Sequence, residues 1–216
     1  MTETTVVHLM RHGEVDNPSG VLYGRLPDYH LSDLGRKMAE RIAEYVADRD
    51  IVHLVSSPLE RAQETMEPIS NTFGLTPRID ERVIEAANLF EGKKFGVGDG
   101  ALRKPSAWWL LRNPFKPSWG EPYTHLVRRM RDAMETARQA AAGHEALIVS
   151  HQLPIWIVRS AVEGRRLPHD PRKRQCSLAS LTSFTFHGDQ IVSVGYAEPA
   201  KDLLPVKAGK KFTAGA

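Results

Sequence analysis

The sequence contains a single cysteine, Cys176, among 216 residues. One cysteine excludes an internal disulfide and any metal cluster that needs several thiolates. No apolar run approaches the roughly 18 residues of a membrane-spanning helix. The N-terminal residues "MTETTVVHLM" are acidic and polar where a signal peptide needs a basic segment and a longer apolar stretch. These absences predict a cytoplasmic protein without a membrane partner.

The sequence also lacks a strong excess of one charge, since its formal net charge is only +3. The excess lies in residues 201–216, where four lysines stand against one aspartate, so residues 1–200 carry equal numbers of both signs. This balance argues against a basic nucleic-acid-binding face. With 41% hydrophobic and 25% charged residues, the composition is that of a globular protein. We expect one domain over residues 1–200, followed by a basic, mobile tail over 201–216.

Three short apolar segments, residues 6–10, 51–55 and 146–149, are typical of buried strands. Each is followed by polar side chains that could take part in catalysis, which in chain order are Arg11, His12, Arg61 and His151. In a parallel sheet, ligands bind at the carboxyl ends of the strands. We therefore expect these side chains to surround one crevice.

Amphipathic helices are predicted between the apolar segments. Two apolar faces consist of Met38, Ile42, Tyr45 and Val46, and of Leu126, Met130, Met134 and Ala137. Alternating strands and helices predict an α/β fold, a three-layer α/β/α sandwich with a mostly parallel sheet and helices on both faces. Residues 187–189, His-Gly-Asp, resemble a hairpin turn between two strands, so the sheet should be mixed.

Helix starts are indicated after two of the strands. Ser57 has the properties of an N-cap, with Pro58 at the first helical position and Glu60 completing a capping box. Pro154 is expected to open the helix that follows His151.

Residues 88–122 have poor periodicity and are rich in glycine, proline, tryptophan and cations. Long irregular segments in compact domains often cover binding sites. We expect a lid-like insertion, in which Arg112 and Lys116 would contact a second anionic group of the substrate. The alternative is a surface loop held down by its tryptophans.

Two arginines and two histidines around one crevice would attract a phosphoryl group, because arginine matches phosphate oxygens with paired hydrogen bonds. Neighbouring cations should lower the pKa of His12, and neutral imidazole is a nucleophile toward phosphorus. The leaving oxygen then needs a proton from a carboxylic acid. Glu85 is the first candidate for that acid, and Glu14 and Glu91 are weaker ones.

The ordered motifs "LMRHGE", "LSDLG", "SSPLERAQET" and "VSHQ" resemble those of the histidine phosphatase superfamily, also called the phosphoglycerate mutase-like family, over about residues 5–198. The resemblance implies His12 as the phosphorylated nucleophile, with a phosphate pocket of Arg11, Arg61 and His151. It also implies Glu85 as the proton donor, although the "W-E-G"-like element, here Phe90-Glu91-Gly92, arrives one residue early. Asn17 and Gly24 match the family's substrate-binding loop. In the "G-E-S"-like segment, Pro122 replaces the serine.

The favoured function is a metal-independent phosphatase, without a cofactor, that hydrolyses a small phosphorylated metabolite or other phosphomonoester through phosphohistidine. A mutase that passes the phosphoryl group to another hydroxyl is the nearest alternative. The phosphatase is favoured over it because the insertion matches such mutases poorly. A non-catalytic module that binds a phospholigand is a weaker one. A metallohydrolase is disfavoured because no H-E-x-x-H spacing occurs and arginines would repel a metal cation. The sequence does not indicate the oligomeric state.

The same reasoning gives other polar residues structural roles. His8 and His53 alternate with core residues in their strands, and the basic run 165–174 is expected to be a solvated loop. Cys176 is interpreted as a small packing residue.

Overall fold

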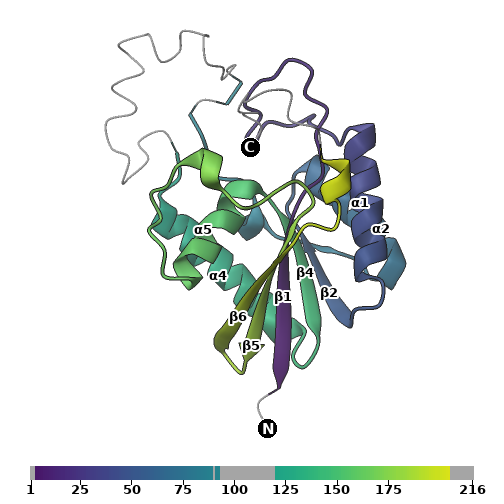
Figure 1. Cartoon of the computed structure of the whole chain (residues 1–216), viewed down its shortest axis with the longest axis vertical. Coiled ribbons are helices and arrows are strands. Elements are labelled where there is room, and N and C mark those ends of the chain that lie inside the picture. Colours follow the sequence, from purple (N-terminus) through teal and green to yellow (C-terminus); the bar gives the residue numbers. More distant parts are fainter. Residues whose placement is uncertain (1–2, 90, 93–119, 205–216) are drawn as a thin grey trace.

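A six-stranded mixed sheet forms the centre of the computed structural model, which describes residues 3–89, 91–92 and 120–204 (Figure 1). The strand order is β3-β2-β4-β1-β5-β6. Strands β3, β2, β4 and β1 run parallel to one another, and β5 runs antiparallel to both of its neighbours, β1 and β6. The strands are β1 Thr4–Arg11, β2 Ile51–Ser56, β3 Arg78–Ile79, β4 Glu145–Ser150, β5 Leu181–His187 and β6 Gln190–Ala197. The predicted mixed sheet, with its antiparallel edge, is confirmed.

Helices cover both faces of the sheet (Figure 1). They are α1 Asp33–Val46, α2 Glu60–Phe73, α4 Tyr123–Ala140 and α5 Gln152–Val162, with short 3-10 turns η1 Glu81–Val83, η3 Pro171–Lys173 and η4 Lys201–Leu203. Apolar residues of α1 and α2 pack on one face in a cluster with Leu147 and Val149, and those of α4 and α5 pack on the other with Ala146 and Ile148. The alternation of these four β4 residues explains the three layers, since successive strand side chains point to opposite faces.

The strand register brings the polar strand ends to one edge of the sheet. Arg11 at the end of β1 pairs with Ser150 at the end of β4, and Ser56 at the end of β2 pairs with Val149. Because these three strands are parallel neighbours, the residues that follow them emerge side by side. This is the edge at which the crevice was predicted.

Three local predictions were wrong. Helix α2 begins at Glu60, and its N-cap is Leu59 rather than Ser57, whose hydroxyl is hydrogen bonded to His151 instead. Helix α5 begins at Gln152, so Pro154 lies inside its first turn. Tyr45 is 47% exposed, while the other members of its predicted apolar face are buried.

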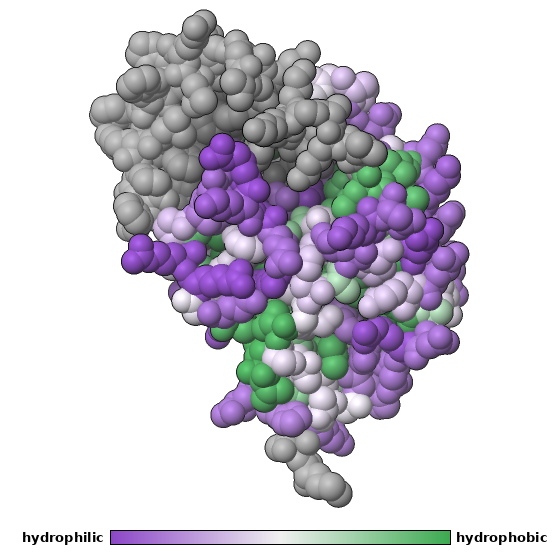
Figure 2. Space-filling model, in the orientation of Figure 1, coloured by the Kyte–Doolittle hydropathy of each residue, from purple (hydrophilic) through white to green (hydrophobic). Residues whose placement is uncertain are grey.

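The β5–β6 hairpin forms the antiparallel edge of the sheet, and its turn lies at Gly188 and Asp189 as predicted. The edge strand β6 leaves Val192 53% exposed, and apolar residues gather on the surface over this hairpin (Figure 2). His187 pairs with Thr4, at the amino end of β1. The exposed apolar surface therefore lies at the opposite end of the sheet from Arg11.

The packed structure continues past the predicted end of the domain at residue 200. Asp202 forms an ion pair with Arg41 of α1 at 3.0 Å, and Leu203 and Leu204 pack against the apolar cluster beneath that helix. The first four residues of the expected tail thus belong to the folded unit. Within residues 3–89, 91–92 and 120–204, no helix combines the length and apolarity needed to span a membrane.

Candidate active site

His12 lies directly after β1 and is fully buried. Its backbone is fixed to the neighbouring strand, since its N–H donates to the Ser150 carbonyl at 3.2 Å. The ring Nδ1 lies 2.8 Å from the carbonyl oxygen of Gly13. A carbonyl can only accept, so Nδ1 carries the proton, and in the neutral ring Nε2 then has a free lone pair. That Nε2 is buried and has no hydrogen-bond partner among the described residues.

The electrostatic surroundings of His12 favour the neutral ring. Burial is the main cause that lowers its pKa well below the ordinary value, and the charges of Arg61 and Arg11 lower it further. The pKa of His12 is therefore lowered, as predicted, although desolvation contributes more to the shift than the two cations do. Neutral His12 with an unprotonated Nε2 is the form that can attack an electrophile.

Arg61, in the first turn of α2, is completely buried. Its Nη2 donates to the Gly24 carbonyl at 2.6 Å, and its guanidinium lies 4.7 Å from the centre of the Tyr23 ring. Its Nε and Nη1 have no hydrogen-bond partner among the described residues. A buried guanidinium with unused donors is suited to bind an anion with several oxygens.

His151 is the N-cap residue of α5 and is also fully buried. Its ring centre lies 5.2 Å from that of His12. Nδ1 lies 3.5 Å from Arg61 Nη2, which can only donate, so Nε2 is the protonated atom and donates to Ser57 Oγ at 2.7 Å. Burial, followed by the charge of Arg61, holds its pKa well below the usual value. His151 is therefore a second neutral imidazole, oriented by Ser57.

Arg11, the last residue of β1, is held by the segment that precedes β5. Its Nη1 donates to the carbonyl of Cys176 at 2.8 Å, and Gln152 Nε2 lies 3.4 Å from the same oxygen. The Cys176 side chain is buried, which raises the pKa of its thiol to about 11. The cysteine is thus a protonated packing residue whose backbone, rather than its sulfur, serves the site.

Glu85 is buried beside these cations, with 2% of its surface exposed. Its Oε1 accepts from the Ala86 N–H at 2.7 Å, while Oε2 has no hydrogen-bond partner among the described residues. Desolvation raises the pKa of this carboxyl, although the Ala86 N–H, Arg61 and Arg174 oppose the shift. Glu85 is therefore biased toward the protonated form, with the proton available on Oε2.

The two weaker candidates for the acid have other partners. Glu14 Oε2 accepts from the hydroxyl of Ser32, the N-cap of α1, at 2.6 Å. Glu91 Oε1 accepts from the backbone N–H groups of Arg25 and Asn88 at 3.1 and 3.3 Å. Both carboxylates organise loops, and Glu85 is the candidate with a buried unpartnered oxygen.

Asn17 and Gly24 contribute to the loop after β1 through backbone contacts. The Asn17 amide donates to the Val21 carbonyl and accepts from the Val21 N–H, at 2.8 and 3.2 Å. Gly24 has φ +43° and offers its carbonyl to Arg61. The structure thus gives these two residues loop-forming and arginine-positioning contacts. Arg112 and Lys116 lie outside the described residues.

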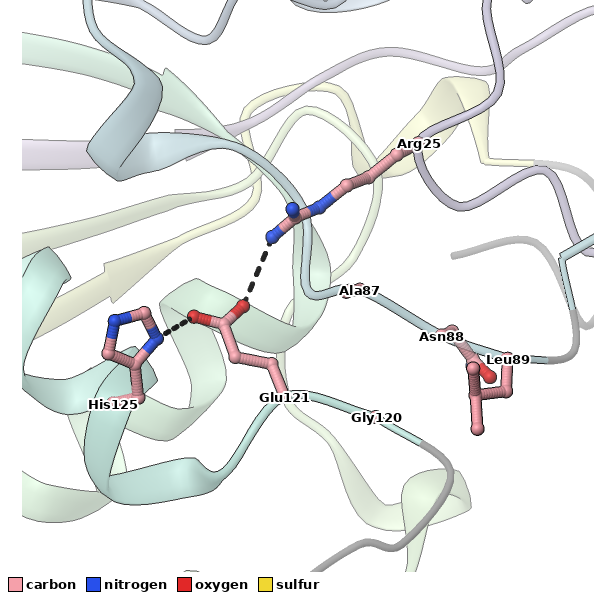
Figure 3. A pocket seen from close by; sticks show the side chains of 7 residues that line it. All are labelled: Arg25, Ala87, Asn88, Leu89, Gly120, Glu121 and His125. Atoms are coloured by element: carbon pink, nitrogen blue, oxygen red, sulfur yellow. Dashed lines mark hydrogen bonds and ion pairs between the residues drawn. The ribbon is translucent and has the colours of Figure 1, made fainter.

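A cavity of about 400 Å³ lies beside the segment that follows Glu85 (Figure 3). It lies between residues 87–89 and 120–125, with Arg25 and Glu121 in its wall. Arg25 Nε donates to the Glu85 carbonyl at 2.7 Å, and its Nη2 donates to Glu121 Oε2 at 3.2 Å. Arg25 thus links the wall of the cavity to the backbone of Glu85.

The sequence did not indicate four residues that the structure places in or around the site. Tyr23 packs on Arg61, Ser57 orients His151, and Arg129 is buried with its guanidinium paired to Glu121 at 2.8 Å. Arg174 interacts electrostatically with Glu85 and Arg11, although its basic segment was expected to face solvent. A signal was present only for Ser57, which follows a strand end, and its hydroxyl was assigned to helix capping.

Four buried atoms of the site have no hydrogen-bond partner among the described residues and indicate what it can do: Nε2 of His12, Nε and Nη1 of Arg61 and Oε2 of Glu85. A nucleophile, anion donors and an acid meet at one place, which is the set required for phosphoryl transfer. No group of three or more His, Cys, Asp and Glu side chains within the described ranges is arranged to hold a metal ion.

Comparisons with known proteins agree with this geometry. The sequence profile of the histidine phosphatase superfamily (branch 1) matches residues 7–199. The uncharacterized protein Rv0525 of Mycobacterium tuberculosis (strain ATCC 25618 / H37Rv) is 54% identical over 200 residues, which cover 93% of this chain and 99% of that protein. A protein of Yersinia pestis (strain Pestoides F), named "Probable phosphoglycerate mutase GpmB", is 30% identical over 187 residues, with 81% of this chain and 83% of that protein covered.

Among solved structures, the native mycobacterial glucosyl-3-phosphoglycerate phosphatase Rv2419c superimposes with a TM-score of 0.71 at 25% identity. The match covers 90% of this chain and 96% of that one. The match to a solved phosphatase structure therefore extends over almost the entire fold, and the predicted fold class is confirmed.

Proposed function

Since the chain belongs to the histidine phosphatase superfamily (branch 1) and is a phosphatase of that family, we propose that it hydrolyses a phosphomonoester through a covalent phosphohistidine on His12. The observation that carries this proposal is the buried Nε2 of His12, whose lone pair is free and whose Nδ1–H is fixed by Gly13. A neutral imidazole held in this tautomer is a nucleophile without further activation.

The first step transfers the phosphoryl group to the enzyme. Nε2 of His12 attacks phosphorus, the bond from phosphorus to the ester oxygen breaks, and Glu85 gives the proton of Oε2 to that leaving oxygen. The unused N–H groups of Arg61, together with Arg11, bind oxygens of the transferring group, where charge accumulates in the transition state. The alcohol then departs, leaving Glu85 as a carboxylate.

The second step returns the enzyme to its starting state. Glu85, now ionised, takes a proton from a water molecule, whose oxygen attacks phosphorus as the bond to His12 Nε2 breaks. The products are inorganic phosphate, neutral His12 and protonated Glu85, so protons and charge balance over the cycle. One carboxyl group thus acts first as an acid and then as a base.

The substrate is proposed to be a small phosphorylated metabolite. The names of the relatives include a glucosyl-3-phosphoglycerate phosphatase and a probable phosphoglycerate mutase, so phosphorylated acids belong in the first panel of substrates. The cavity of about 400 Å³ beside Glu85 offers space for the alcohol part of such a molecule. A mutase would share the first step but return the phosphoryl group to a hydroxyl. Phosphate release and isomer formation from 3-phosphoglycerate would therefore separate the two functions.

The test of the proposal is to trap the intermediate. Wild-type protein mixed with a radiolabelled phosphomonoester and quenched in base should carry acid-labile, base-stable phosphate. His12→Ala should carry none and should lose turnover by at least about 10⁴-fold. His187→Ala, which changes an exposed histidine in the hairpin turn, is the matched control and should behave as wild type. Near-normal turnover of His12→Ala would overturn the proposal.

A further inference from the structure

One cation of the site has no role in the steps above. Arg174 is the last residue of the basic run 165–174 and is partly buried. It lies two residues before Cys176, whose carbonyl holds Arg11, and its Nη1 donates to Gln152 Oε1 at 3.1 Å. Gln152 directly follows His151. These contacts bring Arg174 to the rim of the phosphate pocket. Arg174 thus departs from the solvated loop expected for residues 165–174, whose other cations, Arg165, Arg166, Arg172 and Lys173, are exposed.

Neutral groups hold the Arg174 guanidinium in place. Its Nε donates to His169 Nε2 at 2.8 Å. His169 can accept there because its Nδ1 donates to the Leu167 carbonyl at 2.6 Å, which fixes the neutral tautomer. The His169 ring in turn lies 5.8 Å from the Trp156 ring and 6.0 Å from the Tyr123 ring, measured between ring centres. The arginine is therefore oriented without being neutralised.

Two buried arginines outside the phosphate pocket are paired with carboxylates. Arg129 is 2.8 Å from Glu121, and Arg159 is 3.1 Å from Glu163. Arg174 has no ion pair within residues 3–89, 91–92 and 120–204. Removing a cation from water without a counter-ion is unfavourable, so such a group usually serves to bind an anion.

The position of Arg174 indicates which part of a substrate it would meet. The charged groups with which it interacts are Glu85, on the side of the leaving oxygen, and Arg11, in the phosphate pocket. In the proposed mechanism Glu85 is protonated while substrate binds, so it does not neutralise the arginine. An anionic group on the alcohol part of the substrate would.

We propose that Arg174 is a specificity-determining residue that binds a second anionic group, a carboxylate or a second phosphate, on the leaving-group side of the substrate. The inference rests on the proposed phosphatase function and adds the substrate class. The Nη2 of Arg174 and the second N–H of Nη1 are not engaged by Gln152 or His169. They form the planar pair of donors that matches two oxygens of one anion, which a lysine cannot reproduce.

Pairs of substrates that differ in one anionic group test the proposal. For the carboxylate, 3-phosphoglycerate is compared with glycerol 3-phosphate, and 2-phosphoglycerate with glycerol 2-phosphate. For the second phosphate, fructose 1,6-bisphosphate is compared with fructose 6-phosphate. Para-nitrophenyl phosphate, which has no second anion, reports the chemistry alone. The readout is kcat/KM for phosphate release by the full chain.

We expect the wild-type enzyme to prefer the member that carries the second anionic group in at least one pair. Arg174→Gln should lower kcat/KM for that member by about 10- to 100-fold, the effect of losing a charged hydrogen bond. The loss should fall mainly on KM. Activity on para-nitrophenyl phosphate should fall by a smaller factor than activity on that member. Arg174→Lys should recover only part of the loss. Lys173→Gln, an exposed neighbour in the same segment, is the matched control and should change no ratio.

His169→Phe provides a second variant should Arg174→Gln fold poorly, because it keeps an aromatic ring against Trp156 while it removes the acceptor for Arg174 and the donor to the Leu167 carbonyl. It should weaken the same preference to a lesser degree. Equal effects of Arg174→Gln on both members of every pair would overturn the inference, since a role limited to tuning Glu85 acts on all substrates alike. Failure of wild type to release phosphate from any compound would instead contradict the proposed function.

Discussion

At the scale of single residues, the site consists of polar atoms that the fold buries and leaves unsatisfied. His12 Nε2, two nitrogens of Arg61 and Glu85 Oε2 have no partner among the described residues. Each such atom destabilises the folded protein by about 1 to 3 kcal/mol relative to a satisfied one. Four of them in one place, in a fold with an otherwise ordinary apolar core, indicate that stability is sacrificed there for binding and chemistry.

The pH dependence of activity should report Glu85. Because desolvation raises the pKa of this carboxyl, the acid form persists above the pH at which an ordinary glutamate ionises, and is lost as pH rises through the raised pKa. Plots of kcat/KM against pH should therefore fall on the alkaline side for an alkyl phosphate, whose leaving oxygen needs the proton. Glu85→Gln should remove this limb and lower kcat/KM by about 10² to 10³.

The same variant should respond less on para-nitrophenyl phosphate, whose phenolate leaves without full protonation. A Glu85→Gln enzyme that keeps the wild-type alkaline limb on both substrates would show that another group supplies the proton.

Glu85 should also affect stability with a definite sign. A carboxyl whose pKa is raised by folding favours the folded state below its unfolded pKa, and this contribution is lost as pH rises through the folded pKa. At neutral pH the buried site opposes ionisation, whereas glutamine does not titrate. Glu85→Gln should therefore gain free energy of unfolding relative to wild type as pH rises from about 4 to 8. Urea unfolding at several pH values measures this, with the exposed Glu67→Gln as control. Parallel curves for wild type and Glu85→Gln would contradict the prediction.

Ser57 is expected to act through His151. Its hydroxyl accepts from His151 Nε2 at 2.7 Å, so Ser57→Ala leaves the imidazole free to rotate or to change tautomer. We predict a fall in kcat of about 10-fold, in line with the loss of a group that orients a catalytic histidine. Ser56→Ala removes a neighbouring buried hydroxyl that bonds only the Ser57 carbonyl and is the matched control. Equal kcat values for the two variants would rule out a specific role for Ser57.

At the scale of elements, close backbone contact fixes the loop that carries His12. A Cβ placed on Gly35 of α1 would lie 2.0 Å from the carbonyl oxygen of Glu14, and one on Gly13 would lie 2.6 Å from the carbonyl oxygen of Gly35. Helix α1 can therefore approach the loop after β1 only because both positions are glycine. This approach presses the loop against the first turn of the helix and holds Gly13, the acceptor of the His12 ring, in position.

Gly35→Ala should therefore reverse the usual effect of alanine in a helix. In an unconstrained helix the change stabilises by about 1 kcal/mol. Here the methyl group meets backbone that cannot move without displacing the loop, so we expect a loss of about 1 to 3 kcal/mol in the free energy of unfolding and lower turnover. Lys37→Ala, exposed on the same helix, should change stability by less than about 0.5 kcal/mol. Chemical denaturation and turnover measured on both variants decide this, and a stabilised, fully active Gly35→Ala would exclude the constraint.

Elements also show where sequence reasoning succeeds and where it stops. The strands and apolar helix faces were predictable because the spacing of apolar residues within one short segment determines which of them are buried, as for Met38, Ile42 and Val46. The start of α2 was not predictable in this way. Ser57 has the local chemistry of an N-cap, but the ring of His151, 94 residues away, binds its hydroxyl. A tertiary partner thus overrides a local preference, which no window of sequence can report.

At the scale of the whole molecule, the site was predictable to the extent that it follows sheet topology. Arg11 and His151 lie far apart in sequence, yet each follows a parallel strand, so one rule about strand ends brings them together. Arg174 follows no strand and belongs to a segment with the composition of a solvated loop. Its contribution depends on that segment folding back so that the Cys176 carbonyl reaches Arg11. The sequence therefore predicted which strand-end side chains meet at this edge of the sheet, whereas the placement of Arg174 required the structure.

The charge distribution of the whole site also predicts how the enzyme responds to metal removal. Four arginines, at positions 11, 61, 129 and 174, interact with the buried histidines or with Glu85, and Glu85 is biased toward its neutral form. A divalent cation would meet repulsion and no set of carboxylate ligands, whereas a phosphate dianion meets complementary charge. Turnover of para-nitrophenyl phosphate should therefore stay within about two-fold after incubation with EDTA and desalting, and added Mg²⁺ or Zn²⁺ should not increase it.

Orthovanadate, which adopts the five-coordinate geometry of the transferring phosphoryl group, should in contrast inhibit competitively and more strongly than inorganic phosphate, because analogues of a transition state bind more tightly than the ground state. His12→Ala should lose the advantage of vanadate over phosphate, because the nitrogen that occupies one apical position is gone. Loss of activity with EDTA, restored by one divalent ion, would mean that a metal ion rather than the arginine cluster stabilises the charge on the phosphoryl oxygens. That result would favour the metallohydrolase alternative.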